Sequence, residues 1–184
     1  MDLTGKMIIA MPALGDPRFA LSVILICAHS PDGAMGLILN KPLGDLSFSQ
    51  LLTQLSIPQA PAGRDIRVHF GGPVERGRGF VLHSADFTSG QATMTIPGGL
   101  GMTATLDILE ALAQGNGPAQ ALLALGYAGW GPGQLEAEIG RNDWLTAETS
   151  GDLIFAPDNA AKWTRALKTL GVDPVSLSST AGRA

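Results

Sequence analysis

The sequence predicts a single α+β domain, and three observations support that fold class. Strand-like apolar segments dominate the first hundred residues, whereas patterns with apolar residues three and four positions apart dominate the remainder. Of the 184 residues, 45% are hydrophobic and only 15% are charged, which suits one compact core and excludes a disordered chain or a coiled coil. We therefore expect residues 1–174 to form the domain. Residues 175–184, rich in Ser, Thr, Gly and Ala, are expected to form a flexible tail.

Short apolar segments mark the predicted strands. They are Lys6–Met11, Ser22–Ala28, Met35–Asn40, Ile66–Phe70, Gly79–His83, Thr93–Ile96, Trp144–Glu148 and Leu153–Phe155. The second and third are apolar without alternation, so both faces of these central strands should be covered. The turn sequence Ser30-Pro31-Asp32-Gly33 between them predicts an antiparallel hairpin. A second hairpin is predicted from Ile66–Phe70 to Gly79–His83.

Apolar residues at helical spacing, together with capping residues, mark five predicted helices. They are Phe48–Leu55, a helix from Thr103 or Thr105 to Gly115, Ala119–Leu125, Gln134–Ile139 and Asp158–Leu170. The last is expected to be a surface helix, with Trp163 and Leu167 on its apolar face and Lys162 among the residues on its other sides.

The segment Gly126–Gly133 is predicted to be a glycine-rich loop between two helices. Tyr127 and Trp130 in this loop either pack over the core or contribute to a recognition surface. The same two alternatives apply to Asn142 and Trp144.

Charge and cysteine content exclude several classes of function. The net charge is −4, from 12 Lys and Arg against 16 Asp and Glu, so the overall field repels nucleic-acid backbones. The single cysteine, Cys27, excludes an intramolecular disulfide, and no Cys/His cluster has zinc-like spacing. The longest apolar run, Phe19–Ala28, is about half the length that spans a bilayer. We therefore expect a cytoplasmic protein with no metal, no cofactor and no membrane segment.

Several unusual stretches occur together in one order. They are Met11-Pro-Ala-Leu-Gly-Asp-Pro-Arg-Phe19, Ile24-Leu-Ile-Cys-Ala-His29, Gly33-Ala-Met-Gly-Leu-Ile-Leu-Asn-Lys-Pro42, Phe70-Gly-Gly-Pro-Val74, Arg78-Gly-Phe-Val-Leu-His83, Leu125-Gly-Tyr-Ala-Gly-Trp-Gly-Pro-Gly-Gln-Leu135 and Asn142-Asp-Trp-Leu145. Together they resemble the YqgE/AlgH family of bacterial proteins, from about Leu3 to Val172.

The resemblance implies an α+β domain whose bent, largely antiparallel sheet closes into a pseudo-barrel, flanked by helices mainly from the C-terminal half. Members of the family are often labelled transcriptional regulators, after an effect on alginate production. The family has no agreed ligand, reaction or active site, so the resemblance supplies no catalytic residues.

Cys27 and His29 form one candidate site. At positions i and i+2 of a strand their side chains should share a face, as a thiolate–imidazole pair for nucleophilic catalysis requires. The alternative is structural. A cysteine inside an apolar strand is expected to be a buried residue with a raised pKa, and His29 then bonds a loop carbonyl.

The glycine-rich loop Gly71–Gly79 is the main candidate for ligand binding. Backbone N–H groups at Gly71 and Gly72 and the guanidinium groups of Arg76 and Arg78 could converge on a phosphate or carboxylate. Further basic or titratable residues lie nearby in the sequence: Arg64, Arg67, His69 and His83. The alternative is a simple hairpin loop, with the arginines paired to Asp65 and Glu75.

Asn40 and Lys41 follow a central strand, at a position where polar groups often meet a ligand. Lys41 could then complement the two arginines. The alternative is that Asn40 only caps the strand end and Lys41 is solvated. Asp16 and Asp32 lie beside Pro and Gly and are expected in Asx-type turns, not in a carboxylate dyad.

These observations favour a non-catalytic regulatory or binding module that recognises a small anionic ligand or a protein partner through the loop Gly71–Arg78. One alternative is a small hydrolase or thiol-dependent enzyme that uses Cys27 and His29. Another is a direct DNA-binding regulator, which takes its support from the family label; among the residues, only the basic ones of the helix Asp158–Leu170 favour it. We therefore expect direct binding of nucleic acid to be absent and any transcriptional effect to be indirect.

Overall fold

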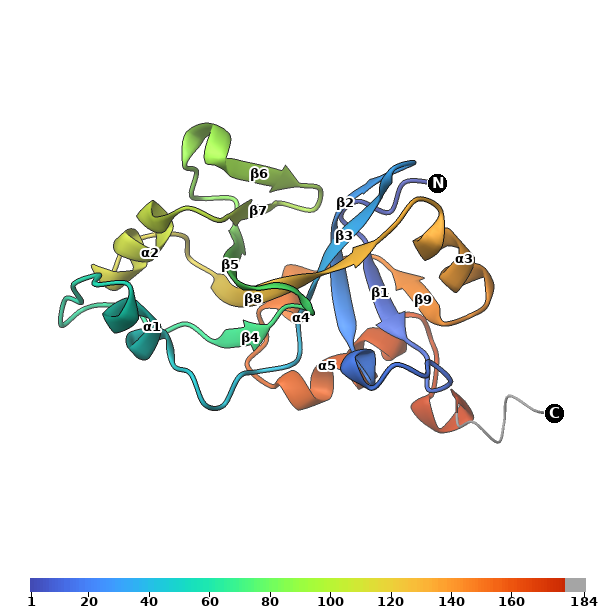
Figure 1. Ribbon diagram of the computed structural model, residues 1–184. Helices are drawn as coiled ribbons and strands as arrows, with labels where there is room; N and C mark the ends of the chain where they lie inside the picture. Colours follow the sequence, from blue (N-terminus) through green and yellow to red (C-terminus); the bar gives the residue numbers. More distant parts are fainter. Residues whose placement is uncertain (178–184) are drawn as a thin grey trace.

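The computed structural model describes residues 1–177, which form nine strands and five α-helices (Figure 1). The strands are β1 Met7–Ala10, β2 Val23–Ser30, β3 Gly33–Ile38, β4 Val68–Phe70, β5 Val74–Ser84, β6 Thr93–Ile96, β7 Leu100–Thr103, β8 Ala121–Trp130 and β9 Trp144–Ala147. The α-helices are α1 Phe48–Gln54, α2 Leu106–Ala113, α3 Gln134–Gly140, α4 Gly151–Ile154 and α5 Asn159–Thr169. The 3-10 turns are η1 Pro17–Phe19, η2 Gly90–Ala92 and η3 Pro174–Leu177. Residues 175–177 of the predicted tail thus lie in η3, and residues 178–184 lie outside the described part of the chain.

All nine strands belong to one sheet, in the order β6-β7-β5-β8-β3-β2-β1-β9, with β4 paired to β8 off this path. Every pairing is antiparallel except that of β4 with β8. Strand β8 belongs to both halves of the sheet, because Ala121–Leu125 pairs with β5 and Ala128–Trp130 pairs with β3. In Figure 1 the β5–β7 part curls away from the β1–β3 part around β8.

The predicted fold class is confirmed. The sheet is bent and largely antiparallel, and four of the five helices follow residue 105. Within the described residues the edge strands β6 and β9 do not pair with each other, so the sheet forms an open half-barrel.

The continuous apolar strands are covered on both faces, as predicted. In β2, Val23 and Leu25 enter one core cluster, which also receives Leu167 of α5. Ile24 and Ile26 point the other way, into a second cluster that contains Leu135 of α3. A third cluster packs α1 and α2 against β4, β5 and β8. Each of the three core clusters therefore combines side chains of the sheet with side chains of the helices that pack on it.

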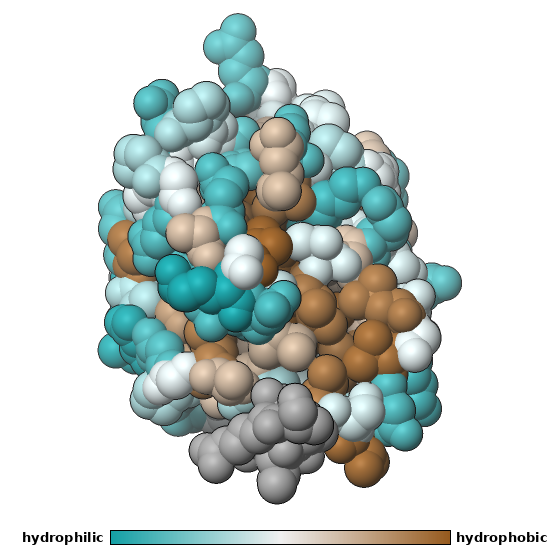
Figure 2. Space-filling view, turned by 90° about the vertical axis from the view of Figure 1, so that its right-hand side faces the viewer, coloured by the Kyte–Doolittle hydropathy of each residue, from teal (hydrophilic) through white to brown (hydrophobic). Residues whose placement is uncertain are grey.

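The face that carries α3 and β9 is turned towards the viewer in Figure 2. Polar side chains cover most of it, although only 15% of the residues are charged, and apolar side chains gather in its lower part. Of the helices in residues 1–177, none has both the length and the apolar character needed to cross a membrane.

The hairpin predicted at Ser30–Gly33 is confirmed, and it contains an irregularity that the sequence did not predict. Ser30 pairs with Gly33 at the tip, where Gly33 has a φ of 142° that suits glycine. Further along, the register between β2 and β3 shifts between Ile26 and Ala28, so Cys27 forms a β-bulge. A bulge changes which face the following side chains point to.

Strand β8 is the main error of the sequence-based prediction. Ala119–Leu125 is predicted to be a helix and Gly126–Gly133 a loop, whereas residues 121–130 form one strand. Alanine and leucine favour helices, but Leu123–Leu125 is hydrogen-bonded to β4 on one edge and to β5 on the other. This tertiary pairing overrides the local preference.

Two further predictions are wrong for related reasons. The segment Leu153–Phe155 lies in and just after α4 instead of in a strand, because a run of three apolar residues does not distinguish strand from helix. The predicted hairpin between Ile66–Phe70 and Gly79–His83 does not form, since β4 and β5 each pair with β8. Strand β7, Leu100–Thr103, has no counterpart among the predicted strands.

A close backbone crossing fixes β8 against the residues that follow β4. The N–H of Gly71 donates to the Leu125 carbonyl at 2.8 Å, and the Gly71 carbonyl accepts from the N–H of Ile38 at 3.0 Å. Gly72 has a φ of +155°, and a Cβ built on it would lie 2.0 Å from the carbonyl carbon of Tyr127. Only glycine fits at this crossing.

We expect Gly72→Ala to destabilise the fold by about 3 kcal/mol or more, because the new methyl group meets backbone and the φ value is strained. Gly77→Ala, in the exposed first part of β5 with open space around its Cβ, is the matched control and should change stability by less than about 1 kcal/mol. Chemical denaturation of both variants measures the difference. Equal stability of the two variants would show that the crossing is not a constraint.

Candidate functional site

The predicted pair Cys27 and His29 lies on opposite faces of the sheet. Cys27 belongs to the core cluster that contains Leu25, whereas His29 turns towards Leu3 and α3. The bulge at Cys27 is the reason, because residues i and i+2 share a face only where the pleat is regular. Cys27 is 2% exposed, its Sγ lies 3.7 Å from the Leu25 carbonyl, and burial raises the pKa of the thiol to about 12.

His29 has both ring nitrogens engaged in hydrogen bonds. The N–H of Leu3 donates to Nδ1 at 2.9 Å, so Nε2 carries the proton and donates to Oε1 of Glu136 at 3.0 Å. The bond from His29 holds the pKa of the Glu136 carboxyl below its usual range. His29 therefore ties the start of the chain and α3 to the β2–β3 hairpin.

Gly71 and Gly72, expected to present N–H groups to an anion, are instead buried at the crossing with β8. The prediction of a loop over Gly71–Gly79 is wrong from Val74 on, because these residues form the start of β5, with an irregular register between Val74 and Gly79. Both arginines there are exposed but have different surroundings. The guanidinium of Arg76 lies 5.6 Å from the centre of the Phe70 ring, and that of Arg78 lies 4.9 Å from the centre of the Phe80 ring. The structure does not bring the four residues together around one point.

Asn40 and Lys41 hold the turn that leads into β2. Oδ1 of Asn40 accepts from the N–H of Val23 at 3.0 Å, and its Nδ2 donates to the Leu21 carbonyl at 2.8 Å. Lys41 Nζ donates to the Ala20 carbonyl at 2.8 Å, and partial burial lowers the pKa of this amine. Leu21 has a φ of 57°, which is uncommon for a leucine, so these bonds stabilise a strained turn.

A groove of about 700 Å³ lies between the β2–β3 hairpin, β5, the β6–β7 hairpin and the C-terminal half of β8. We call it the hairpin groove; in Figure 1 the β6–β7 hairpin and the tip of the β2–β3 hairpin both lie above β8. Its apolar lining comes from Met35, Val74, Phe80, Met94, Met102, Tyr127 and Trp130. Arg78, His29 and Asp32 also line it, but Arg76, Asn40 and Lys41 do not. Its volume is typical of a site for a small organic molecule.

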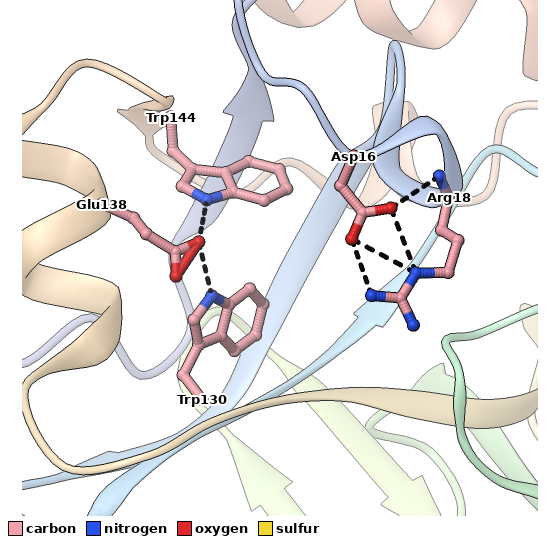
Figure 3. Close-up of polar contacts among 5 residues, drawn as sticks. All are labelled: Asp16, Arg18, Trp130, Glu138 and Trp144. Carbon is pink, nitrogen blue, oxygen red and sulfur yellow. Dashed lines mark hydrogen bonds and ion pairs between the residues drawn. The ribbon is translucent and has the colours of Figure 1, made fainter.

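Glu138 of α3 bridges Trp144 and Trp130, the second of which lines the hairpin groove (Figure 3). Its Oε1 accepts from Nε1 of Trp130 at 3.3 Å and from Nε1 of Trp144 at 3.2 Å. The two rings meet edge to face with centroids 6.1 Å apart, and both are buried. Of the two alternatives for these tryptophans, packing over the core is the one the structure adopts, although Trp130 also lines the hairpin groove.

Figure 3 also shows Asp16, whose side chain caps η1. Its Oδ1 accepts from the backbone N–H of Arg18 at 3.0 Å, and its Oδ2 lies 2.7 Å from Nη2 of the same residue. Hydrogen bonds from Arg18 hold the pKa of the Asp16 carboxyl below its usual range. The Asx-type turn predicted for Asp16 is confirmed, and its carboxylate is paired with an arginine.

His69 and His83 are buried, so they do not extend the basic character around Arg76 and Arg78. Nδ1 of His69 donates to the Leu123 carbonyl at 3.3 Å, and Nε2 accepts from the side-chain amide of Asn159 at 3.2 Å. Burial lowers the pKa of both histidines, that of His69 to about 4. Within residues 1–177, no three His, Cys, Asp or Glu side chains gather where they could hold a metal ion.

The groove residues that the sequence analysis missed are mainly methionines on β6 and β7. Met94 stands between two threonines on an edge strand and is exposed, whereas Met102 is buried. An apolar side chain on the open face of an edge strand was a detectable signal of an apolar surface. The groove itself depends on the bend at β8, which the local sequence did not predict.

Comparison with known proteins gives consistent matches along the chain. A family model described as AlgH-like matches residues 7–175. A UPF0301 protein from Cereibacter sphaeroides is 66% identical over 184 residues, which cover 100% of both chains. A UPF0301 protein from Ruegeria pomeroyi is 57% identical over 185 residues, again 100% of both chains.

Two solved structures share the fold. The solution structure of the AlgH protein from Pseudomonas aeruginosa matches with a TM-score of 0.80 and 40% identity, over 100% of this chain and 97% of that one. A crystal structure from Corynebacterium diphtheriae matches with a TM-score of 0.72 and 23% identity, over 91% and 86% of the two chains, a likeness of fold alone. The resemblance inferred from the sequence motifs is confirmed.

We expect Cys27 to be inert towards iodoacetamide in the folded protein. A pKa of about 12 leaves roughly a thousandfold less thiolate near neutral pH than an ordinary cysteine has, and burial blocks access as well. Labelling followed by mass spectrometry, with and without guanidinium chloride, measures the difference. Rapid labelling without denaturant would restore the thiol-enzyme alternative.

Stability should fall as the pH drops from about 6.5 to about 4. The depressed pKa of His69 means that the unfolded chain takes up a proton in this window while the folded protein does not, which favours unfolding by about 3 kcal/mol at pH 4. His69→Gln should flatten the stability profile in this window, whereas His29→Gln should leave that contribution in place. Denaturation series at several pH values test this, and an unchanged slope in His69→Gln would contradict it.

Proposed function

The chain belongs to the AlgH-like family, and we propose that it is a non-catalytic binding module whose hairpin groove takes a small organic anion with an apolar body. The observation that carries this proposal is the combination of one exposed guanidinium, that of Arg78, with an apolar and aromatic lining. Regulation would then follow from the bound ligand, and any effect on transcription would be indirect.

Arg78 is held ready for an anion by two contacts. Its guanidinium lies over the Phe80 ring, which restricts the side chain and leaves the N–H donors at its edge available. Nη1 lies 3.7 Å from Oε2 of Glu75, longer than a hydrogen bond, and both side chains are exposed. Such a pair is worth at most about 1 kcal/mol, so a carboxylate or phosphate ligand can replace Glu75.

The apolar body of the ligand would lie against Met35, Met102 and Tyr127. Methionine side chains adapt to different shapes, and the Tyr127 ring already packs edge to face on Phe80 at 6.0 Å. Arg76, which lies over Phe70 and outside the groove, has no part in this proposal.

The thiol-enzyme alternative has little structural support. Nucleophilic catalysis needs the thiol and imidazole within hydrogen-bond reach, and the bulge directs Cys27 and His29 to opposite faces of the sheet. The imidazole is already bonded to Leu3 and Glu136.

The DNA-binding alternative also loses support. Of the three basic residues on α5, Lys162 is buried, which leaves Arg165 and Lys168 to meet a phosphate backbone. Two contacts on a chain with a net charge of −4 make a weak electrostatic footprint.

A protein partner is the second candidate, because β6 is an edge strand beside the groove. An extended segment of a partner could pair with this edge and place its side chains in the groove. A small ligand and a partner segment would both occupy the hairpin groove. A small ligand bound there should therefore compete with the partner segment.

The probe 8-anilinonaphthalene-1-sulfonate tests the groove, since it joins an aromatic body to an anionic group. We expect saturable binding that Arg78→Ala weakens about tenfold, as the loss of a charge-assisted hydrogen bond predicts. Arg76→Ala is the matched control, because it removes the same charge from the same exposed part of β5 and should leave the affinity unchanged. Equal affinities in the two variants would overturn the assignment of Arg78, and near-UV circular dichroism confirms that each variant is folded.

A further inference from the structure

A second hollow of about 280 Å³ lies away from the hairpin groove, between the Arg64–His69 segment, the start of β8, α4 and the first turn of α5. Its polar lining is mostly basic or neutral: Arg64, Arg67, His69, Gln120, Asn159 and Lys162, with Asp65 as the one acidic side chain among the residues described there. None of the residues predicted as ligand-binding lines it. We call it the lysine cavity.

Lys162 is the unusual group in this cavity. It is 1% exposed, yet it lies on a helix that the sequence pattern predicts to be on the surface. Its Nζ donates to the Leu39 carbonyl at 3.0 Å and to the Ile154 carbonyl at 2.7 Å. An ammonium group has three N–H donors, so one remains after these two bonds. Within residues 1–177, no carboxylate forms an ion pair with it.

The surroundings of Lys162 increase the cost of its charge. Burial, together with the positive charges of Arg67 and Arg165, lowers the pKa of the amine to about 8. Lys162 also lies in the first turn of α5, where the helix dipole disfavours a cation. His69, which lines the same cavity, is neutral at pH 7 and supplies no negative charge to balance that of Lys162. A buried charge is normally paired, so this cluster lacks an anion.

Two arginines complete the positive character of the cavity in different ways. Arg64 donates to the carbonyls of Pro118 and Ala119, so it contributes charge but has few donors left. Arg67 is exposed, and no ion pair is formed by it among the described residues. Its guanidinium can therefore turn to a ligand held at Lys162, and the fork of N–H groups suits a tetrahedral oxyanion.

We propose that the lysine cavity binds a phosphate-type oxyanion, either inorganic phosphate or the phosphate group of a monoester, with Lys162 and Arg67 as its main contacts. A volume of about 280 Å³ is small for a whole cofactor but sufficient for one such group. The exposed side of the cavity, at Arg67, leaves room for the remainder of a monoester to project into solvent. The anion supplies the negative charge that the buried ammonium lacks.

Inorganic phosphate, with chloride as the ionic-strength control, is the first probe. Saturable binding should raise the melting temperature of the parent protein, because the ligand binds only the folded state. Arg67→Gln should weaken the affinity about tenfold, whereas Arg165→Gln should bind as the parent does. The two variants are matched, since each removes one exposed arginine near Lys162 and only Arg67 lines the cavity.

Lys162→Met gives a second test and should abolish the phosphate-dependent shift. Since this residue is buried and its loss affects folding, Arg67→Gln keeps the proposal testable if Lys162→Met does not fold. Calorimetry with sulfate at pH 9, in two buffers of different ionisation enthalpy, measures the number of protons taken up on binding. A lysine with only a structural role would give no such uptake. An anion beside Lys162 favours its charged form, so binding should take up a proton.

The outcomes separate the sources of the anion. Tighter binding of a phosphate monoester than of inorganic phosphate supports the proposal and assigns the site to an organic ligand, and the reverse order supports it for the free ion. No phosphate-specific shift, or an equal loss in Arg67→Gln and Arg165→Gln, overturns it. The Arg78→Ala variant should keep phosphate binding, so the two sites can fail independently.

Discussion

The architecture depends on the close contact between Gly71–Gly72 and the backbone of β8. Any side chain at Gly72 would collide with the carbonyl carbon of Tyr127, and Gly71 is bonded both to Leu125 and to Ile38. This crossing lets the chain pass from β4 to β5 while β8 continues from one half of the sheet into the other. The bend in the sheet, and with it the hairpin groove, follows from the sharing of β8.

The parts of the fold that could be predicted from the sequence are those in which local preference and tertiary environment agree. The β2–β3 hairpin has apolar strands, a turn sequence between them and cover on both faces. Helix α1 begins at Phe48 as predicted, and Ser47 and Gln50 form a capping box at its start. Strand β8 is the opposite case. Its Ala- and Leu-rich first half favours a helix, and pairing partners distant in sequence decide its structure.

The candidate sites were harder to predict, because a shift of one or two residues along a strand decides which functional groups meet. One extra residue at the Cys27 bulge separates a thiol and an imidazole that a regular strand would place together. Arg76 and Arg78 are two residues apart at the start of β5 but lie over different aromatic rings. Lys162 was placed on the solvated side of α5, although it shares the buried face with Asn159 and Ala166, three residues before it and four after it. The helical spacing of Asn159, Lys162 and Ala166 is visible in the sequence. The burial of Lys162 was not predicted from it, because a charged lysine is normally expected in solvent.

The two hollows are related through β8, whose C-terminal half lines the hairpin groove and whose first residues line the lysine cavity. Over Leu123–Leu125 this strand is hydrogen-bonded on both edges, so displacing it would break backbone hydrogen bonds to β4 and to β5 together. We therefore expect binding at one hollow to leave the shape of the sheet at the other unchanged. In the two proposals, a bound ligand would act through the altered charge and surface at its own site: a neutralised Lys162 cluster beside α5, and a filled groove beside the free edge of β6. The shared strand would then hold two separate ligand-dependent surfaces in one fixed arrangement.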